Sequence, residues 1–362
     1  TNLYLTEPSI RLAEELVKAT FADRVFFCNS GAEANEAAIK IARKFSSLNN
    51  SKEKREILTF EGSFHGRTLT TISATAQPKY QYGFEPLTEG FRYCPFNDFE
   101  AAEKMIGPQT CAVLIEPIQG EGGVKPAESG FLHHLRKLCD QHQALLIFDE
   151  IQCGMGRTGK LFGYQWEKSP DSEQPAETSQ KGNKKPLNIT ESNLMPDILT
   201  MAKALGGGLP LGAMLCTEEV AQSFKPGDHG TTFGGNPLVT AVAEASLRKI
   251  NSPELMQQVQ KKGTFIRKNL DLLNDELSMF ETIRGRGLML GAVLSKAWKG
   301  KAPSIVNACQ ENGVLVLTAG PDVMRFLPPL NISDEELETG LNRIEKALKN
   351  LHAVELSSAT QK

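Results

Sequence analysis

Residues 144–150 read ALLIFDE, a run of five apolar side chains that ends in the acids Asp149 and Glu150. An uninterrupted apolar run of this length is typical of a strand that is buried on both faces of a sheet. Similar runs alternate along the chain with amphipathic stretches, which predicts an α/β fold with a mostly parallel central sheet. The predicted strands are residues 24–28, 56–60, 111–116, 144–149, 197–202 and 211–216, and the predicted helices include 10–20, 33–45, 130–142 and 239–250.

The pattern changes after about residue 250, where long amphipathic stretches enclose two short strands near 288–293 and 314–317. We therefore expect a large domain over residues 1–250, a smaller α+β domain over 251–356 and a tail at 357–362. Residues 168–193, KSPDSEQPAETSQKGNKKPLNITESN, are almost without apolar side chains. Such a segment cannot bury enough surface to offset its ordering entropy, so we predict a disordered surface insertion.

The composition excludes several classes of protein. Forty basic residues stand against 43 acidic ones, which predicts no surface for nucleic acid or anionic lipid. No apolar run approaches the roughly 18 residues of a membrane span. The seven cysteines are scattered without a CxxC pair, which indicates reduced thiols in a cytosolic or organelle-matrix protein and no metal site. Because the chain begins at Thr1, we expect a fragment or a processed form.

Two of the predicted strands end in residues that could carry chemistry. Lys203 follows one strand between two alanines, where desolvation would lower the pKa of its amine toward the neutral form that a Schiff-base nucleophile needs. Asp149 ends a second strand, at the edge where α/β proteins bind ligands. A carboxylate there could keep the ring nitrogen of pyridoxal phosphate protonated. The combination is more specific than either residue alone.

Three loops add possible ligand contacts. Ser30, Gly31, Ala32 and Glu33 open a predicted helix as a capping box, and the exposed backbone N–H groups there suit a phosphate. The loop at 61–67 contains Phe64, His65 and Arg67, which could stack on a ring and bind a carboxylate, or could be structural. The glycine-rich turn at 230–237 offers the hydroxyls of Thr231 and Thr232.

A competing prediction rests on Gly154–Lys160. Its glycine spacing matches both a dinucleotide fingerprint and an incomplete P-loop. Leu161 stands where a P-loop needs Ser or Thr, and LFGYQWEK is a poor helix. A nucleotide-binding protein that uses this segment remains an alternative.

The sequence resembles the class III aminotransferases, which depend on pyridoxal phosphate, and within that class it most resembles the acetylornithine aminotransferases. The resemblance covers nearly the whole chain apart from residues 168–193. It rests on CNSGAEANEAAIK (28–40), FEGSFHGRT (60–68), IEPIQGEGGV (115–124), LLIFDEIQCGMGRTGKLF (145–162), PDILTMAKALGGGLPLGAM (196–214), GDHGTTFGGNPL (227–238), IRGRGLMLG (283–291) and TAGPDVMRFLPPL (318–330).

The resemblance implies fold type I of the pyridoxal-phosphate-dependent transferases and a role for each matched residue. Lys203 would form the imine with the cofactor and move the proton, and Asp149 would pair with the pyridinium nitrogen. The other implied cofactor contacts are Ser30, Gly31 and Ala32 at the phosphate, Phe64 on the ring, Gln152 near the phenolic oxygen and Thr232 from a neighbouring subunit. The implied substrate residues are Arg67, Thr231 and a switching pair, Glu121 and Arg325.

The implied reaction transfers the ω-amino group of N2-acetyl-L-ornithine to 2-oxoglutarate, giving N-acetyl-L-glutamate 5-semialdehyde and L-glutamate in arginine biosynthesis. Ornithine or 4-aminobutyrate as donor remains an alternative. The resemblance also implies a homodimer with shared active sites. We expect the mitochondrial matrix as the compartment, with cytoplasm or plastid as alternatives. Members of the family normally carry a further amino-terminal segment, and its lack would leave the completeness of the site in doubt. Ala32 replaces a more frequent threonine.

Overall fold

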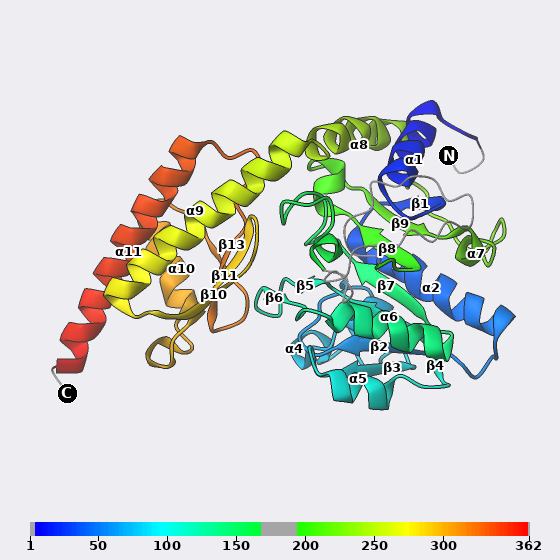
Figure 1. Ribbon diagram of the computed structural model, residues 1–362, viewed down its shortest axis with the longest axis horizontal. Helices are drawn as coiled ribbons and strands as arrows, with labels where there is room; N and C mark the ends of the chain where they lie inside the picture. The colour runs from blue at the N-terminus through cyan, green and yellow to red at the C-terminus, as the bar shows by residue number, and fades with distance from the viewer. Residues whose placement is uncertain (1–3, 168–193, 361–362) are drawn as a thin grey trace, which may run out of the picture. The chain divides into compact units, whose positions relative to one another are not determined.

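The computed structural model describes residues 4–167 and 194–360. These residues form two compact units (Figure 1). The first unit contains the chain up to Pro117, Ala127–Met155 and the described part of Phe162–Ile250. The second unit contains Ile118–Pro126, Gly156–Leu161 and the chain from Asn251 onward. The insertion that we predict at residues 168–193 lies outside the described residues.

The first unit is built on a sheet with the strand order β1-β9-β8-β7-β4-β2-β3. Neighbours from β8 to β3 are parallel, and β9 runs antiparallel to both β8 and β1. The predicted mostly parallel sheet is therefore confirmed. Its strands are β1 (Arg24–Cys28), β2 (Glu56–Phe60), β3 (Phe91–Cys94), β4 (Thr110–Ile115), β7 (Leu145–Asp149), β8 (Ile198–Met201) and β9 (Gly212–Cys216).

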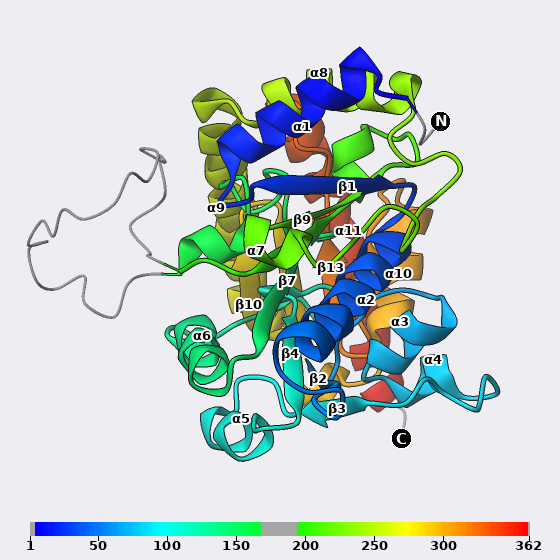
Figure 2. The same cartoon turned by 90° about the vertical axis from the view of Figure 1, so that its right-hand side faces the viewer.

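Helices cover both faces of this sheet. Figure 2 shows α2 (Gly31–Asn49) on one side of the strands and α6 (Phe131–His142) on the other. The sheet-facing side of α2 is rich in small residues, among them Ala34, Ala38 and Ala42, so the helix packs closely on the sheet. The remaining helices of this unit are α1 (Glu7–Ala19), α3 (Leu69–Ala74), α4 (Pro78–Gln81), α5 (Phe99–Met105), η1 (Gly163–Trp166), η2 (Lys203–Gly206), α7 (Glu218–Ala221) and α8 (Pro237–Ile250).

The strand that sequence reasoning missed in this unit lies at the edge of the sheet. β3 reads FRYC, and Arg92 and Tyr93 within it are exposed. An edge strand with one solvated face lacks the continuous apolar run by which the central strands are recognised.

The second unit has an antiparallel sheet with the order β10-β11-β13-β12 and, in the described chain, three α-helices. The predicted strand at 314–317 is wrong over most of its length, because β12 begins only at Leu317. The last helix continues through the predicted tail to Thr360. The elements are β5 (Ile118–Gln119), β6 (Lys125–Pro126), α9 (Pro253–Leu277), β10 (Phe280–Arg286), β11 (Met289–Leu294), η3 (Lys296–Trp298), α10 (Ala302–Glu311), β12 (Leu317–Thr318), β13 (Val323–Phe326) and α11 (Asp334–Thr360).

All seven cysteines are buried and none forms a disulfide. Burial raises the pKa of the Cys111 thiol to about 12, so this thiol stays protonated. Among the described residues, no helix has both the length and the apolar character that crossing a bilayer requires.

Candidate active site

A cavity of about 580 Å³ lies in the first unit where its parallel strands end. The loops that follow β2, β4, β7 and β8 all contribute to its wall, together with the start of α2. Ligands of α/β proteins bind at this edge of the sheet, and the volume is within the usual range for small-molecule sites. The lining residues include 29–32 before and in α2, 64–67 after β2, Glu116 after β4, Asp149, Ile151 and Gln152 at and after the end of β7, and Lys203 after β8.

The amino terminus of α2 meets the cavity at Ser30, Gly31 and Ala32. The Ser30 hydroxyl accepts the N–H of Glu33 at 3.2 Å, which is half of the predicted capping box. The other half differs from the prediction, because the Glu33 carboxylate accepts the N–H of Asn29 at 2.6 Å. The N–H groups of Gly31 and Ala32 belong to the first turn, where a helix offers no internal acceptor. This terminus therefore suits an anion.

Asp149 is 3 % exposed and its carboxylate is held from several sides. The Oδ2 atom accepts a hydrogen bond from Asn35 Nδ2 at 2.8 Å and lies 2.8 Å from Nδ1 of His65. The Oδ1 atom accepts the N–H of Ile151 at 3.1 Å. A carboxylate in this setting is fixed in orientation at the wall of the cavity.

The sequence did not predict the contacts that two of these partners make. From the sequence, His65 could contact a ligand or could be structural, and the structure places its Nδ1 against Asp149. Asn35 is completely buried in the second turn of α2 and was not predicted as a site residue. A signal was present, because Asn35 is an amide among alanines on the apolar face of the predicted helix. Buried amides need hydrogen-bond partners, which points to a polar group beneath.

Lys203 lines the cavity as predicted, but the expectation that it is buried is wrong, because its side chain is exposed in this chain. It stands beyond the end of the buried strand β8, at the start of the short helix η2, and so forms part of an open wall. Its φ angle is 44°, in the left-handed region that non-glycine residues seldom adopt. Such strain persists where the surroundings impose it, often at functional sites.

Phe64 and Arg67 both line the cavity. The Phe64 ring packs edge-on against Tyr80, with centroids 5.4 Å apart. The Arg67 guanidinium lies 4.4 Å from the centroid of the Tyr80 ring and 5.5 Å from that of Phe64. Tyr80 was missed by sequence reasoning because it comes from α4, outside the motifs. The stacking holds an exposed arginine at the cavity, where it can meet a carboxylate.

Glu150 does not line the cavity and is completely buried. Its two oxygens accept the N–H groups of Gly163 and Tyr164, each at 2.8 Å, and Cys153 Sγ lies 3.0 Å from one of them. Burial raises the pKa of this carboxyl to about 7. These hydrogen bonds link the segment that follows β7, which contains Gln152, to η1.

The nucleotide-binding alternative fails on local structure. Gly154–Lys160 forms a series of turns, and the short 3-10 helix η1 follows it where a phosphate-binding α-helix would be required. The glycines have packing reasons instead. A Cβ at Gly154 would lie 2.5 Å from the carbonyl oxygen of Glu150, and Gly159 has a φ of +85° with Gln260 packed against it.

The two threonines of the turn at 230–237 differ in their exposure to solvent. Thr231 is half-buried, and its Oγ1 accepts a hydrogen bond from Asn29 Nδ2 at 2.8 Å. Thr232 is exposed, as is the neighbouring Phe233, of which 70 % is accessible.

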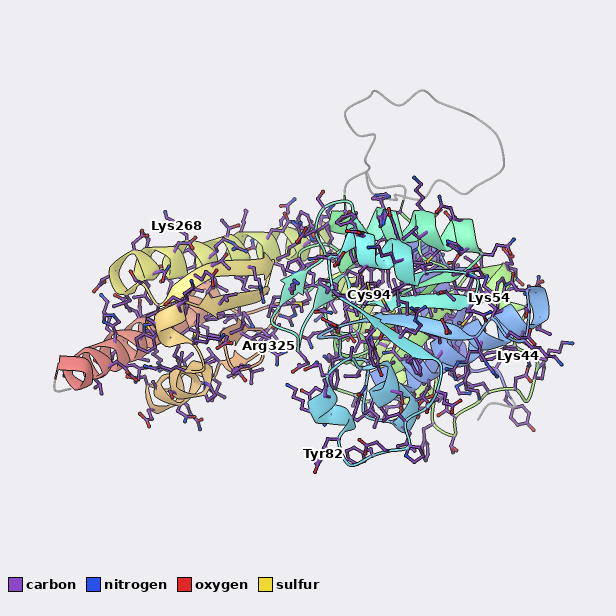
Figure 3. The ribbon with its side chains drawn as sticks, turned by 90° about the horizontal axis from the view of Figure 1, so that it is seen from below. Lys44, Lys54, Tyr82, Cys94, Lys268 and Arg325 are labelled. Carbon is purple, nitrogen blue, oxygen red and sulfur yellow. The ribbon has the colours of Figure 1, made fainter. Side chains whose placement is uncertain are left out.

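Glu121 and Arg325 form an ion pair within the second unit. Arg325 comes from β13 and is labelled in Figure 3. Its Nη1 donates to Oε1 of Glu121 at 2.6 Å. Arg325 is 7 % exposed, so its charge needs a partner, and the predicted pair of residues does meet.

The cavity residues fit the cofactor that the resemblance implies. Pyridoxal phosphate has an anionic phosphate, a flat ring, a ring nitrogen that can be protonated and an aldehyde. The cavity offers, in the same order, a helix amino terminus, the Phe64 ring, the Asp149 carboxylate and the Lys203 amine. The buried Nε2 of His65, in the wall behind Asp149, has no hydrogen-bond partner among the described residues.

Comparison with known proteins identifies the family. The sequence profile described as aminotransferase class-III matches residues 1–173 and 187–348. The acetylornithine aminotransferase of Xanthomonas axonopodis pv. citri is 53 % identical over 350 residues, which cover 96 % of this chain and 80 % of that protein. A Pseudomonas aeruginosa protein named succinylornithine transaminase/acetylornithine aminotransferase is 48 % identical over 97 % of this chain and 80 % of its own length.

Solved structures agree with this result. The N-acetylornithine aminotransferase of Stenotrophomonas maltophilia K279a superimposes with a TM-score of 0.79 at 44 % identity, covering 97 % of this chain and 82 % of that one. The ornithine aminotransferase of Toxoplasma gondii superimposes with a TM-score of 0.86 at 31 % identity, covering 97 % and 78 %. The profile, the sequence identity and the shared fold all lead to one conclusion: this chain belongs to the class III aminotransferases, transaminases that depend on pyridoxal phosphate.

Proposed function

We propose that this chain moves the ω-amino group of N2-acetyl-L-ornithine to 2-oxoglutarate and so releases N-acetyl-L-glutamate 5-semialdehyde and L-glutamate, a step of arginine biosynthesis. The observation that carries the proposal is the single cavity that holds Lys203, Asp149, Phe64 and the amino terminus of α2. The donor is chosen from the relatives, because a protein 53 % identical to this chain is named acetylornithine aminotransferase.

The cavity residues divide the work of holding the cofactor. Pyridoxal phosphate, when bound, supplies an electron sink and carries the amino group between the two substrates. Asp149 keeps the ring nitrogen protonated, because an ionised buried carboxylate favours a neighbouring cation. Lys203 supplies the amine that binds the cofactor and then moves a proton. Ser30, Gly31 and Ala32 hold the phosphate at the start of α2. Phe64 packs on the ring, and Gln152 donates near its phenolic oxygen.

The substrates are recognised by charge. Arg67 binds a substrate carboxylate, and we assign a substrate contact to Thr231, whose hydroxyl is held by the cavity residue Asn29. Glu121 keeps Arg325 paired while the donor reacts through its ω-amino end, which carries no carboxylate, and it releases Arg325 to the additional carboxylate of 2-oxoglutarate. The 2.6 Å ion pair supports this switch, since Arg325 already has an anionic partner to exchange.

We further propose that the protein is a homodimer with shared active sites. The exposed Thr232 would reach the phosphate bound by a second copy, and the exposed Phe233 beside it would be covered by that copy. The first unit would act as the cofactor-binding domain, corresponding to the expected residues 1–250, and the second as the smaller domain. The two relatives named above come from the bacteria Xanthomonas and Pseudomonas, so we propose a bacterial cytoplasm and not the mitochondrial matrix.

A second donor has specific support. The Pseudomonas aeruginosa relative is named for succinylornithine as well as acetylornithine. Both donors carry an acylated α-amine, so the same pocket could take either. Ornithine is the donor in the name of a Toxoplasma gondii structure with lower identity, 31 %. Neither ornithine nor 4-aminobutyrate is therefore preferred.

The proposal is tested by the rates with four amino donors. Purified holoenzyme is assayed with 2-oxoglutarate and acetylornithine, succinylornithine, ornithine or 4-aminobutyrate, and kcat/KM is compared. We expect the two acylated donors to lead by at least about tenfold, since the charged α-amine of ornithine lacks a partner in a site built for an acyl group, and 4-aminobutyrate has no acylamino group to fill that site. A Lys203→Ala chain serves as the inactive control. A strong preference for free ornithine would refute the assignment of the donor.

A further inference from the structure

Behind the cavity wall, a chain of hydrogen bonds leads from Asp149 to a hydroxyl in the interior. Thr200 Oγ1 donates to Oδ1 of Asn35 at 2.8 Å, and Asn35 Nδ2 donates to Oδ2 of Asp149 at 2.8 Å. Both Asn35 and Thr200 are completely buried. The chain is therefore shielded from water, and each of its hydrogen bonds has to be made by the protein itself.

The fold brings these three residues together from two strands and a helix. Asp149 and Thr200 are direct partners in the parallel pair of β7 and β8. Side chains at such positions point to the same face of a sheet, and α2 covers that face (Figure 2). Asn35 projects from α2 onto both. No local sequence pattern links positions 35, 149 and 200.

Asn35 can donate a hydrogen bond to Asp149 in only one orientation of its side-chain amide. Its Nδ2 donates to Asp149 and also to the carbonyl oxygen of His65, at 2.8 Å in each case. Both neighbours are acceptors, so a flipped amide would place its oxygen against two other oxygens. In the observed orientation the amide oxygen faces Thr200, whose hydroxyl supplies the proton that this oxygen needs.

We propose that Thr200 and Asn35 are positioning residues for Asp149: Thr200 holds the Asn35 amide with its N–H groups toward the carboxylate, and Asn35 keeps that carboxylate ionised and aimed at the ring nitrogen of the cofactor. The inference rests on the proposed role of Asp149. It adds that the charge of Asp149 depends on a hydroxyl that touches neither cofactor nor substrate.

Removal of the Thr200 hydroxyl should change where the proton between Asp149 and the cofactor's ring nitrogen is held. Without the Thr200 hydroxyl, the buried amide oxygen of Asn35 lacks a donor, so the amide turns or shifts to find one. Asp149 Oδ2 then loses an N–H donor or meets an oxygen, and its affinity for a proton rises. The proton that it shares with the ring nitrogen moves toward the carboxylate. The ring nitrogen of the bound cofactor would then be protonated less fully and would withdraw electrons less strongly.

The chain contains a matched control for this change. Thr59 lies in β2, is completely buried like Thr200, and its Oγ1 has no hydrogen-bond partner among the described residues. Thr59→Val and Thr200→Val therefore make the same chemical substitution in a buried strand of the same sheet. Only Thr200→Val removes a hydrogen bond.

The test compares Thr200→Val, Thr200→Ser, Thr59→Val and the wild type as holoenzymes. Nitrogen NMR of cofactor with an isotope-labelled ring nitrogen reports whether that atom is protonated, and steady-state rates separate kcat from KM. We expect wild type, Thr59→Val and Thr200→Ser to keep a protonated nitrogen. Thr200→Val should show a larger fraction of neutral nitrogen at the same pH, with kcat up to about tenfold lower and KM little changed, the size expected when one charge-assisted hydrogen bond is lost.

Two results would overturn the inference. One is a wild-type nitrogen signal in Thr200→Val, and the other is an equal loss in Thr59→Val, which would indicate general packing of the core. Should Thr200→Val not fold, Thr200→Ala with Thr59→Ala as its control gives the same comparison without an added methyl group. Failure of the proposed function is distinct, because the wild type itself would then bind no cofactor or show a neutral ring nitrogen.

Discussion

Glu150 is a buried acid whose protonation is coupled to folding. Burial raises the pKa of its carboxyl to about 7, whereas an unfolded glutamate titrates near 4.3. Between these pH values the folded chain holds a proton that the unfolded chain has released. The free energy of unfolding should therefore fall as the pH rises from about 4.5 to 7. In Glu150→Gln, which cannot ionise, this contribution is absent. Relative to that variant, we expect the free energy of unfolding of the wild type to fall by roughly 3 kcal/mol between about pH 4.5 and pH 7.

Urea unfolding of both proteins at the two ends of the window measures this difference. Glu100→Gln provides the control, since Glu100 is an exposed acid that pairs with Lys104 one helical turn away. The Glu100→Gln variant should show the same pH dependence of the free energy of unfolding as the wild type. Parallel pH profiles for Glu150→Gln and the wild type would mean that Glu150 is already ionised in the folded chain.

At the scale of elements, the position of α2 depends on the absence of a side chain on β9. Gly212 lies opposite Cys28 in the antiparallel pair of β1 and β9. A Cβ at Gly212 would lie 2.4 Å from the carbonyl oxygen of Ser30, the N-cap of α2. In Gly212→Ala this helix end must move, so we expect about 1–3 kcal/mol of destabilisation. Pyridoxal phosphate should also bind roughly tenfold more weakly, through loss of phosphate contacts at the helix terminus.

Urea unfolding and cofactor titration of the apoprotein measure both effects. Gly107→Ala is the matched control, because a Cβ at Gly107 would meet no atom within 4 Å. This variant should keep the stability and the cofactor affinity of the wild type. If Gly212→Ala bound the cofactor as tightly as the wild type, the start of α2 would not be the phosphate site.

At the scale of the whole molecule, shared sites make a prediction about mixed dimers. Lys203→Ala removes the amine of a chain's own site, and Thr232→Val removes the hydroxyl that the chain lends to its partner. A dimer of one chain of each kind contains one site with both Lys203 and Thr232 intact. Co-expression in equal amounts should therefore restore about a quarter of the wild-type sites.

Rates of the co-expressed, purified dimers with acetylornithine provide the measurement. Each variant expressed alone is the control and should fall below the mixture. A mixture with only the average activity of the two separate variants would show that Thr232 acts within its own chain or not at all.

The sequence by itself determined the fold class and most of the candidate site. Apolar runs such as residues 144–148 predict buried parallel strands, and β7 is found one residue shorter than predicted. The resemblance names Lys203, Asp149 and the start of α2, and these residues line one cavity. Such features are local, because an apolar run or a helix cap is decided by residues adjacent in the chain.

Only the tertiary structure decided what surrounds these residues. The hydrogen bonds from Thr200 through Asn35 to Asp149 join positions far apart in the chain. The exposed side chain of Lys203 depends equally on which loops form the cavity wall. Burial and hydrogen-bond partners are properties of packing, and packing joins residues without regard to their separation in sequence. For that reason the sequence names the residues of the site, whereas the folded chain sets the electrostatic environment in which they act.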